Sequence, residues 1–100
     1  MIKHIVFWRL YGESKGFNKN ASIDEFTQEL QKLPNEITDI QSFNYGVNII
    51  KSNDSADIVL ECTFNSIDDL KKYQSHTVHL AFIEKIKHLR YERRVVDYEY

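Results

Sequence analysis

The segment at residues 2–10 alternates like a β-strand, yet it carries apolar side chains on both of its faces. Ile5 and Phe7 share one face, and successive side chains of a strand point to opposite sides of its sheet. A chain of 100 residues forms one domain, residues 1–100, with little material to spare. We therefore expect its own helices to cover one face and a partner to cover the other. The helix-facing parity carries Ile2, His4, Val6, Trp8 and Leu10.

Two segments have helical spacing and recognisable first turns. Ser22 and Glu25 form a Ser-x-x-Glu capping box, which predicts a helix that begins there and stops at Pro34. Ser66 opens a second helix, whose first turn holds acidic residues that complement the helix dipole. We expect this second helix to break or restart around Ser75.

Three further strands are predicted at residues 40–50, 56–64 and 91–100, where apolar and polar residues alternate. The complete order is strand, helix, strand, strand, helix, strand. This order is the split βαβ arrangement of ferredoxin-like α+β domains, in which helices cover one face of a four-stranded antiparallel sheet.

The uncovered sheet face predicts a homodimer. Ile5 and Phe7 on the first strand and Val59 on the third make a patch too apolar to leave in water. A two-fold interface would bury this patch against its own copy. Pairing of the strand edges would close the two sheets into an eight-stranded α+β barrel and remove exposed edges.

Charge and cysteine content narrow the range of partners and compartments. The formal net charge of -2 gives no basic surface for a phosphate backbone, so we expect no nucleic acid partner. The apolar run after the N-terminus is too short for a signal peptide or a membrane span. Cys62 is the only cysteine and lies in an apolar alternation, which predicts a small buried side chain in a reducing, cytoplasmic setting.

Three histidines lie on segments whose apolar faces meet the expected core. His79 falls near the middle of the apolar arc of its helix, His76 lies toward the edge of that arc, and His4 shares the helix-facing parity of the first strand. An imidazole titrates near neutral pH, so a cluster of such groups indicates a site. The alternative is that each is an ordinary hydrogen-bonded core residue.

A pocket between helices and sheet is the expected position of that site. The loop at residues 11–21 contains two of the three glycines and is the natural candidate for a lid over it. An apolar or aromatic metabolite is the expected ligand. The predicted pocket walls are Val6, Trp8, Leu60, Phe82 and Ile86.

The sequence resembles the stress-responsive A/B barrel (Dabb) family. The resemblance lies in KHIVF at 3–7, FNSIDDL at 64–70, YQSHTVH at 73–79 and VVDY at 95–98. It implies a dimeric α+β barrel with a pocket inside each subunit. One member of the family is a plant polyketide cyclase that uses neither metal nor cofactor.

The resemblance also implies roles for individual residues. The catalytic tyrosine and histidine of the plant cyclase match Tyr73 and His79, while His4 matches a pocket histidine and His76 the first histidine of a His-Pro-x-His motif. Thr77 stands where that motif usually has proline, which leaves the start of the helix less constrained.

Two classes of function follow. In a binding module the pocket holds a metabolite, whereas in a cofactor-free cyclase, isomerase or monooxygenase His79 is the general base and Tyr73 donates a hydrogen bond to an enolate. Three imidazoles could alternatively hold zinc. No carboxylate orients them in the sequence and the resemblance implies metal-free chemistry, so we expect neither metal nor cofactor.

Overall fold

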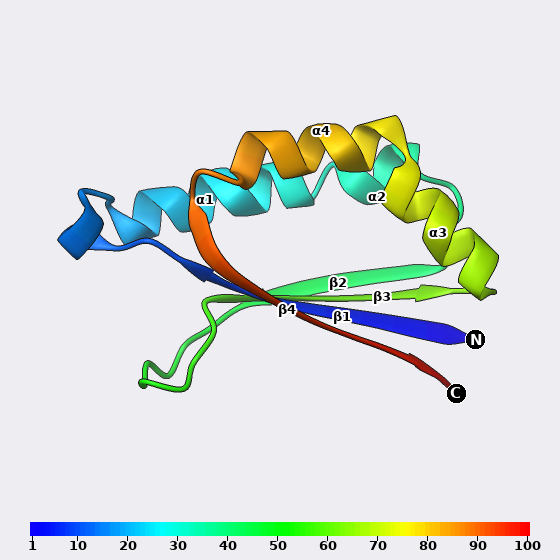
Figure 1. Ribbon diagram of the computed structural model, residues 1–100, viewed down its shortest axis with the longest axis horizontal. Coiled ribbons are helices and arrows are strands. Elements are labelled where there is room, and N and C mark those ends of the chain that lie inside the picture. Colours follow the sequence, from blue (N-terminus) through cyan, green and yellow to red (C-terminus); the bar gives the residue numbers. More distant parts are fainter.

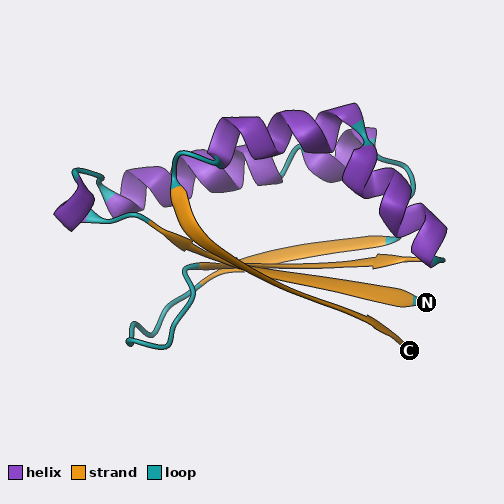
Figure 2. Cartoon of the chain, viewed as in Figure 1, coloured by secondary structure: helices purple, strands orange, loops and turns teal.

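The computed structural model describes residues 1–100 and has the predicted order of strands and helices. Its sheet contains β1 (Ile2–Leu10), β2 (Ser42–Val47), β3 (Ile58–Phe64) and β4 (Arg90–Glu99). The strands are antiparallel and lie in the order β2-β3-β1-β4. All helices lie on one side of the sheet (Figures 1 and 2). The ferredoxin-like α+β prediction is therefore confirmed. No helix is both long enough and apolar enough to cross a membrane.

The first helix begins earlier than predicted. The α1 helix spans Lys19–Leu30, and its N-cap is Asn18, whose side chain accepts a hydrogen bond from the Ala21 amide at 3.0 Å. Ser22 lies inside the helix and is buried, so the predicted capping box is wrong. Asparagine caps as well as serine does, and the earlier cap adds a turn.

The predicted role of Pro34 also needs correction. The α1 helix has ended at Leu30, and Pro34 lies in the first turn of a short helix, α2 (Leu33–Glu36). Proline is tolerated in a first turn because its missing amide would have no partner there.

The predicted break in the second helical segment is confirmed. Ser66 caps α3 (Ile67–Ser75) by accepting a hydrogen bond from the Asp69 amide at 3.1 Å. His76 has extended backbone angles and separates α3 from α4 (Thr77–Ile86).

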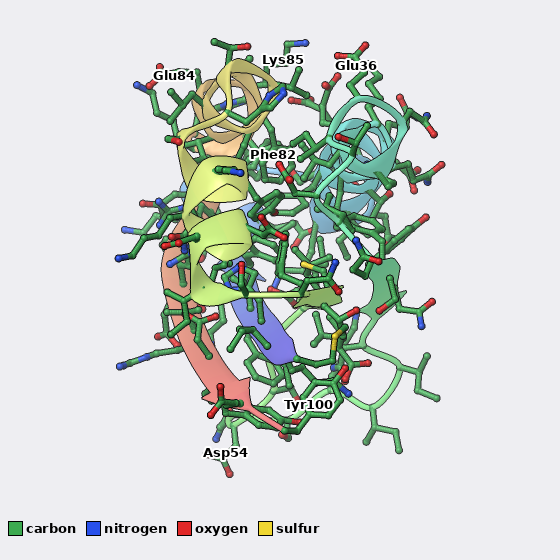
Figure 3. All side chains as sticks on the ribbon, turned by 90° about the vertical axis from the view of Figure 1, so that its right-hand side faces the viewer. Glu36, Asp54, Phe82, Glu84, Lys85 and Tyr100 are labelled. Carbon is green, nitrogen blue, oxygen red and sulfur yellow. The ribbon has the colours of Figure 1, made fainter.

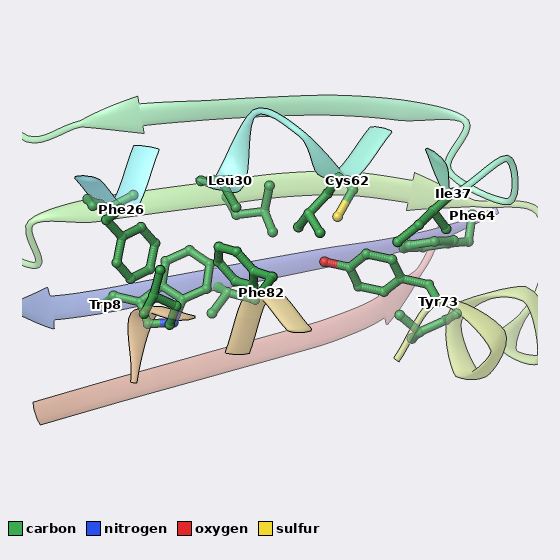
Figure 4. Close-up of a cluster of buried hydrophobic side chains, with 14 of the residues drawn as sticks. Trp8, Phe26, Leu30, Ile37, Cys62, Phe64, Tyr73 and Phe82 are labelled. Carbon is green, nitrogen blue, oxygen red and sulfur yellow. The ribbon is translucent and has the colours of Figure 1, made fainter. Parts of the chain in front are cut away.

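The core lies between the helices and the covered face of the sheet. Trp8 on β1, Phe26 on α1 and Phe82 on α4 meet edge to face, with ring centroids 4.9 Å apart for Trp8 and Phe26 and 5.7 Å for Phe26 and Phe82. Phe82 lies between the helices and the sheet (Figure 3), and the buried aromatic residues extend along the sheet (Figure 4). The helix-facing parity predicted for β1 is confirmed, since His4, Val6, Trp8 and Leu10 are all buried.

The edge strand β2 is shorter and more exposed than predicted. It ends at Val47, and Ile49 beyond it is 90% exposed. Of its helix-facing side chains only Phe43 packs against the core. The reason is its place at the edge of the sheet, since α1 and α3 contact the inner strands.

The face of the sheet away from the helices is uncovered and partly apolar. Phe7 is 39% exposed and pairs with Val59, while Ile5 pairs with Val96, which is 53% exposed. The strand register therefore brings these four side chains together on the same face.

Candidate functional site

A small cavity lies between α4 and the covered face of β1, β3 and β4, with a volume of about 70 Å³. Its walls include every residue predicted for the site except His76. They are His4, Val6, Trp8, Leu60, Tyr73, His79, Phe82, Ile83, Ile86, Arg90 and Arg93.

His4 lies in the middle of β1 and is 1% exposed. Its Nδ1 pairs with a carboxylate oxygen of Asp97, the residue opposite it on β4. The expectation that no carboxylate orients the histidines is therefore wrong for His4, because strand pairing brings together residues that are far apart in the sequence. Because an ionised carboxylate can only accept, Nδ1 carries the proton of this pair. A neutral His4 ring then presents Nε2 as a hydrogen-bond acceptor.

His79 is oriented by the junction between α3 and α4. Its Nδ1 donates a hydrogen bond to the Gln74 carbonyl at 3.1 Å, so the neutral ring also keeps its lone pair on Nε2. Burial lowers the pKa of His79, the bond to Gln74 opposes that shift, and the positive charge of Arg93 lowers the pKa further. The site therefore favours a neutral imidazole with a free Nε2.

The ring of Tyr73, on α3, lies close to both imidazole rings. Its ring centroid lies 4.4 Å from that of His79 and 5.9 Å from that of His4. Burial raises the pKa of Tyr73 above its ordinary value, so its hydroxyl stays protonated and can donate a hydrogen bond. The hydroxyl points along the sheet toward Phe82 (Figure 4).

Three polar atoms at the cavity are free. The Tyr73 hydroxyl and the Nε2 atoms of His4 and His79 have no hydrogen-bond partner in the chain, and no fully buried side-chain nitrogen or oxygen is left unpaired. Because these three atoms lack partners, they cannot be among the fully buried atoms and must have accessible surface. Their residues line the cavity. The cavity thus presents one donor and two acceptors.

Arg90 and Arg93 also line the cavity, whereas neither was predicted as a site residue from the sequence. A bulge in β4 explains the difference: Arg93 pairs with Trp8 and Arg90 with Leu10, so Tyr91 is the extra residue. Both arginines consequently face the helices. They are more exposed than the other polar residues that line the cavity. The opening of the cavity to solvent, its mouth, therefore lies between α4 and β4.

His76 has a structural role instead of lining the cavity. Its Nδ1 accepts a hydrogen bond from the Val78 amide at 3.0 Å and caps α4. The three histidines of the zinc alternative are not brought together, since no group of three potential metal ligands is assembled in the chain.

The loop at residues 11–21 does not cover the histidine cavity. It includes a short 3₁₀ helix, Glu13–Lys15, and its last residues belong to α1. It borders a separate polar cavity of about 790 Å³, where Lys19 and Asp57 form an ion pair at 3.3 Å. The predicted lid is therefore wrong, because this loop leaves β1 at the end away from His4.

Cys62 lies on the covered face of β3, next to this site but not in its wall. Burial raises the pKa of its thiol to about 12. The thiolate needed for nucleophilic chemistry is therefore disfavoured.

Comparisons with known proteins extend over the whole chain. The model of the stress-responsive A/B barrel domain matches residues 2–100, whereas no curated protein matches this chain. Three solved structures illustrate the range of similar proteins. A dimeric, ferredoxin-like protein of unknown function from Bacteroides fragilis is 28% identical, with 99% of this chain and 95% of the other covered and a TM-score of 0.84.

The other two structures carry names of enzymes. A hydroxynitrile lyase from Passiflora edulis is 22% identical, with 97% of this chain and 90% of the other covered and a TM-score of 0.78. An antibiotic biosynthesis monooxygenase is 11% identical, with 100% and 98% covered and a TM-score of 0.72. At these identities the likeness concerns the fold. The family match over residues 2–100 shows that this chain belongs to the stress-responsive A/B barrel domain family.

Proposed function

We propose that this protein is a cytoplasmic homodimer that binds a small apolar or aromatic metabolite in the cavity of each subunit. The observation that carries the proposal is the set of three unpartnered polar atoms, from His4, Tyr73 and His79, on an otherwise mainly apolar wall. A ligand hydroxyl could accept a hydrogen bond from the Tyr73 hydroxyl and donate one to the Nε2 of His4 or of His79, and the apolar walls would contact the rest of the ligand.

The size of the cavity sets how such a ligand is held. A volume of 70 Å³ is about that of two water molecules, and cavities that admit benzene are roughly 150 Å³. The polar end of the ligand would therefore occupy the cavity, and its body would lie toward the mouth beside Ile83. A whole aromatic ring would enter only after movement of a wall residue such as Phe82.

The uncovered sheet face supports the homodimer. Ile5, Phe7, Val59 and Val96 form its exposed apolar patch, and the similar protein from Bacteroides fragilis is described as dimeric. We expect light scattering to give twice the chain mass of 11.9 kDa. A monomer at micromolar concentration would contradict this part of the proposal.

Binding is tested by a thermal-shift screen with benzaldehyde, acetophenone and phenylacetate. A ligand at about 100 times its dissociation constant stabilises the folded state by roughly 2.7 kcal/mol. Tyr73→Phe removes only the hydroxyl, and we expect it to weaken binding about fivefold or more. Tyr45→Phe is the matched control, because Tyr45 is on β2 and outside the cavity wall. Equal affinities of the two variants would argue against the site.

The same cavity supports a second candidate function, cofactor-free acid–base catalysis. The lowered pKa of His79 keeps its imidazole neutral, and its free Nε2 could take a proton from a carbon beside a carbonyl group. The Tyr73 hydroxyl could then donate a hydrogen bond to the enolate oxygen. The match of Tyr73 and His79 to the catalytic residues of the plant polyketide cyclase, which the sequence resemblance implies, and the shared fold of the hydroxynitrile lyase favour this candidate.

The two functions differ in what they require of His79. With a linear polyketide thioester as the substrate, His79→Gln should reduce turnover about 10²- to 10⁴-fold if His79 is the general base. Glutamine keeps a polar side chain of similar size, so binding should survive. Turnover that is unchanged in the variant, or absent from the native protein, would leave the binding function alone.

A further inference from the structure

We propose that the ligand of this cavity is a carboxylate and that Arg93, with Arg90, binds its anionic group at the mouth. This inference rests on the proposed function and specifies the chemical class of the ligand. Arg93 is the specificity-determining residue in this account.

The first support is that neither arginine makes an ion pair within the chain. The other two arginines are paired, since Arg9 and Arg94 both contact Glu92, at 3.7 Å and 3.6 Å. Arg90 and Arg93 line the cavity and make no ion pair or side-chain hydrogen bond within the chain. A guanidinium group prefers a carboxylate, which it can bind through two parallel hydrogen bonds.

The second support is that the fold holds these like charges together. The bulge at Tyr91 turns Arg90 and Arg93 to the same face, although residues three apart on a regular strand face opposite sides. Partial burial lowers the pKa of Arg93, and the charge of Arg90 lowers it further. A bound anion would offset both the burial of the Arg93 charge and its repulsion by Arg90.

The third support is the position of Arg93 relative to the free polar atoms. Arg93 lines the same cavity as Tyr73 and His79. One small acid could therefore place its carboxylate at Arg93 and a second polar group at Tyr73 and His79. Asp97 pairs with His4 instead of with Arg93, which leaves the guanidinium free for the ligand.

The experiment compares acids with their neutral amides. Isobutyrate, benzoate and phenylacetate are each titrated into the native dimer beside the matching primary amide, and binding is followed by calorimetry. We expect each acid that binds to do so about tenfold more tightly than its amide, because a charge-assisted pair is stronger than a neutral one. The preference should shrink as salt is added, since the arginines are partly solvated.

Two variants make the test specific. Arg93→Gln should bring acid and amide to within about twofold of each other, which is the loss of the tenfold preference. Arg94→Gln is the matched control, because its side chain lies on the opposite face of β4, opposite Phe7, and is already paired with Glu92. It should keep the preference for acids.

The outcomes separate this inference from the proposed function. Amides that bind as well as the acids, or an acid preference that survives Arg93→Gln, would overturn the inference while binding in the cavity stands. If Arg93→Gln dissociates the dimer and leaves the preference intact, the guanidinium belongs to an interface and the inference is wrong. If neither acids nor amides bind, the proposed binding function fails with it.

Discussion

The two faces of the sheet differ in how far their side chains are covered. On the covered face the side chains of β1 meet helices, and the polar groups among them are oriented by partners such as Asp97 and Gln74. On the uncovered face Phe7 and Val96 remain exposed although they are apolar. The covered face therefore leaves only a cavity of about 70 Å³ open, whereas the uncovered face leaves apolar side chains of neighbouring strands exposed.

Because of this difference, alternate side chains of the single strand β1 face two different environments. Alternation sends His4 to the cavity and its neighbour Ile5 to the open face. Burial of the open face would not reach the cavity directly, because the sheet lies between them. Substitutions on the two faces should consequently separate folding, association and ligand binding.

The largest effect is expected on the covered face. Phe82→Ala removes a buried ring that packs against Trp8 and Phe26, and it should lower the free energy of unfolding by about 3–5 kcal/mol. Chemical denaturation at two protein concentrations measures this loss. The same loss at both concentrations is expected, because the packing lies within one subunit; a loss of less than about 1 kcal/mol would show that Phe82 is not part of a close-packed core.

A charge on the uncovered face should act on association. Phe7→Asp would bury an unpaired carboxylate in the proposed interface, at a cost of about 3 kcal/mol, which is more than a hundredfold in the dissociation constant. Light scattering over a dilution series measures it. Leu80→Asp is the control, since Leu80 is exposed on α4 and lies on the helix side of the sheet. A dimer that persists in Phe7→Asp would mean that another surface associates.

A smaller effect distinguishes the capping histidine from those of the cavity. His76→Ala removes the side-chain acceptor for the Val78 amide and should cost about 1 kcal/mol of stability, as the loss of an N-cap does. His88→Ala serves as the control, because His88 makes only an exposed pair with Glu25. Thermal unfolding of both variants checks this, and equal stabilities would remove the capping role.

The smallest expected effect is the pH dependence of stability that protonation of His79 contributes. The pKa of His79 is lowered in the folded state, so below its ordinary value of 6.5 the unfolded chain binds more protons at this site than the folded chain does. Stability should therefore fall as the pH drops through about 6.5 toward the lowered pKa, and the contribution of His79 to the pH dependence should vanish only well above 6.5. Subtracting the profile of His79→Gln isolates this group, and identical profiles would contradict the shifted pKa.

Most of the fold could be predicted because periodicity and composition report on burial. The parity of His4 and the break near Ser75 follow from apolar spacing and are present in the structure. The start of α1 could not be chosen in this way. Asn18 and Ser22 are both good N-caps and lie four residues apart, so local propensity does not separate them.

The candidate site was predicted less completely, since its geometry depends on pairing between distant segments. A regular strand would place Arg90 and Arg93 on opposite faces, and only the bulge opposite Arg9 and Leu10 brings them to one. The lid hypothesis failed for a similar reason. Glycine content identifies a loop, but it does not tell which end of the sheet the loop covers.

A ligand in the cavity should contact the free Nε2 atoms of His4 and His79, and nitrogen NMR of the four histidines detects such contact. His76 and His88 lie outside the cavity wall and serve as references within the same spectrum. In the free protein we expect the His79 proton on Nδ1 and a bare Nε2 at neutral pH. On addition of 4-hydroxyphenylacetate, whose hydroxyl can donate to Nε2, the resonances of His4 and His79 should move while those of His76 and His88 stay. Equal movement of all four, or movement of His88 alone, would contradict the account.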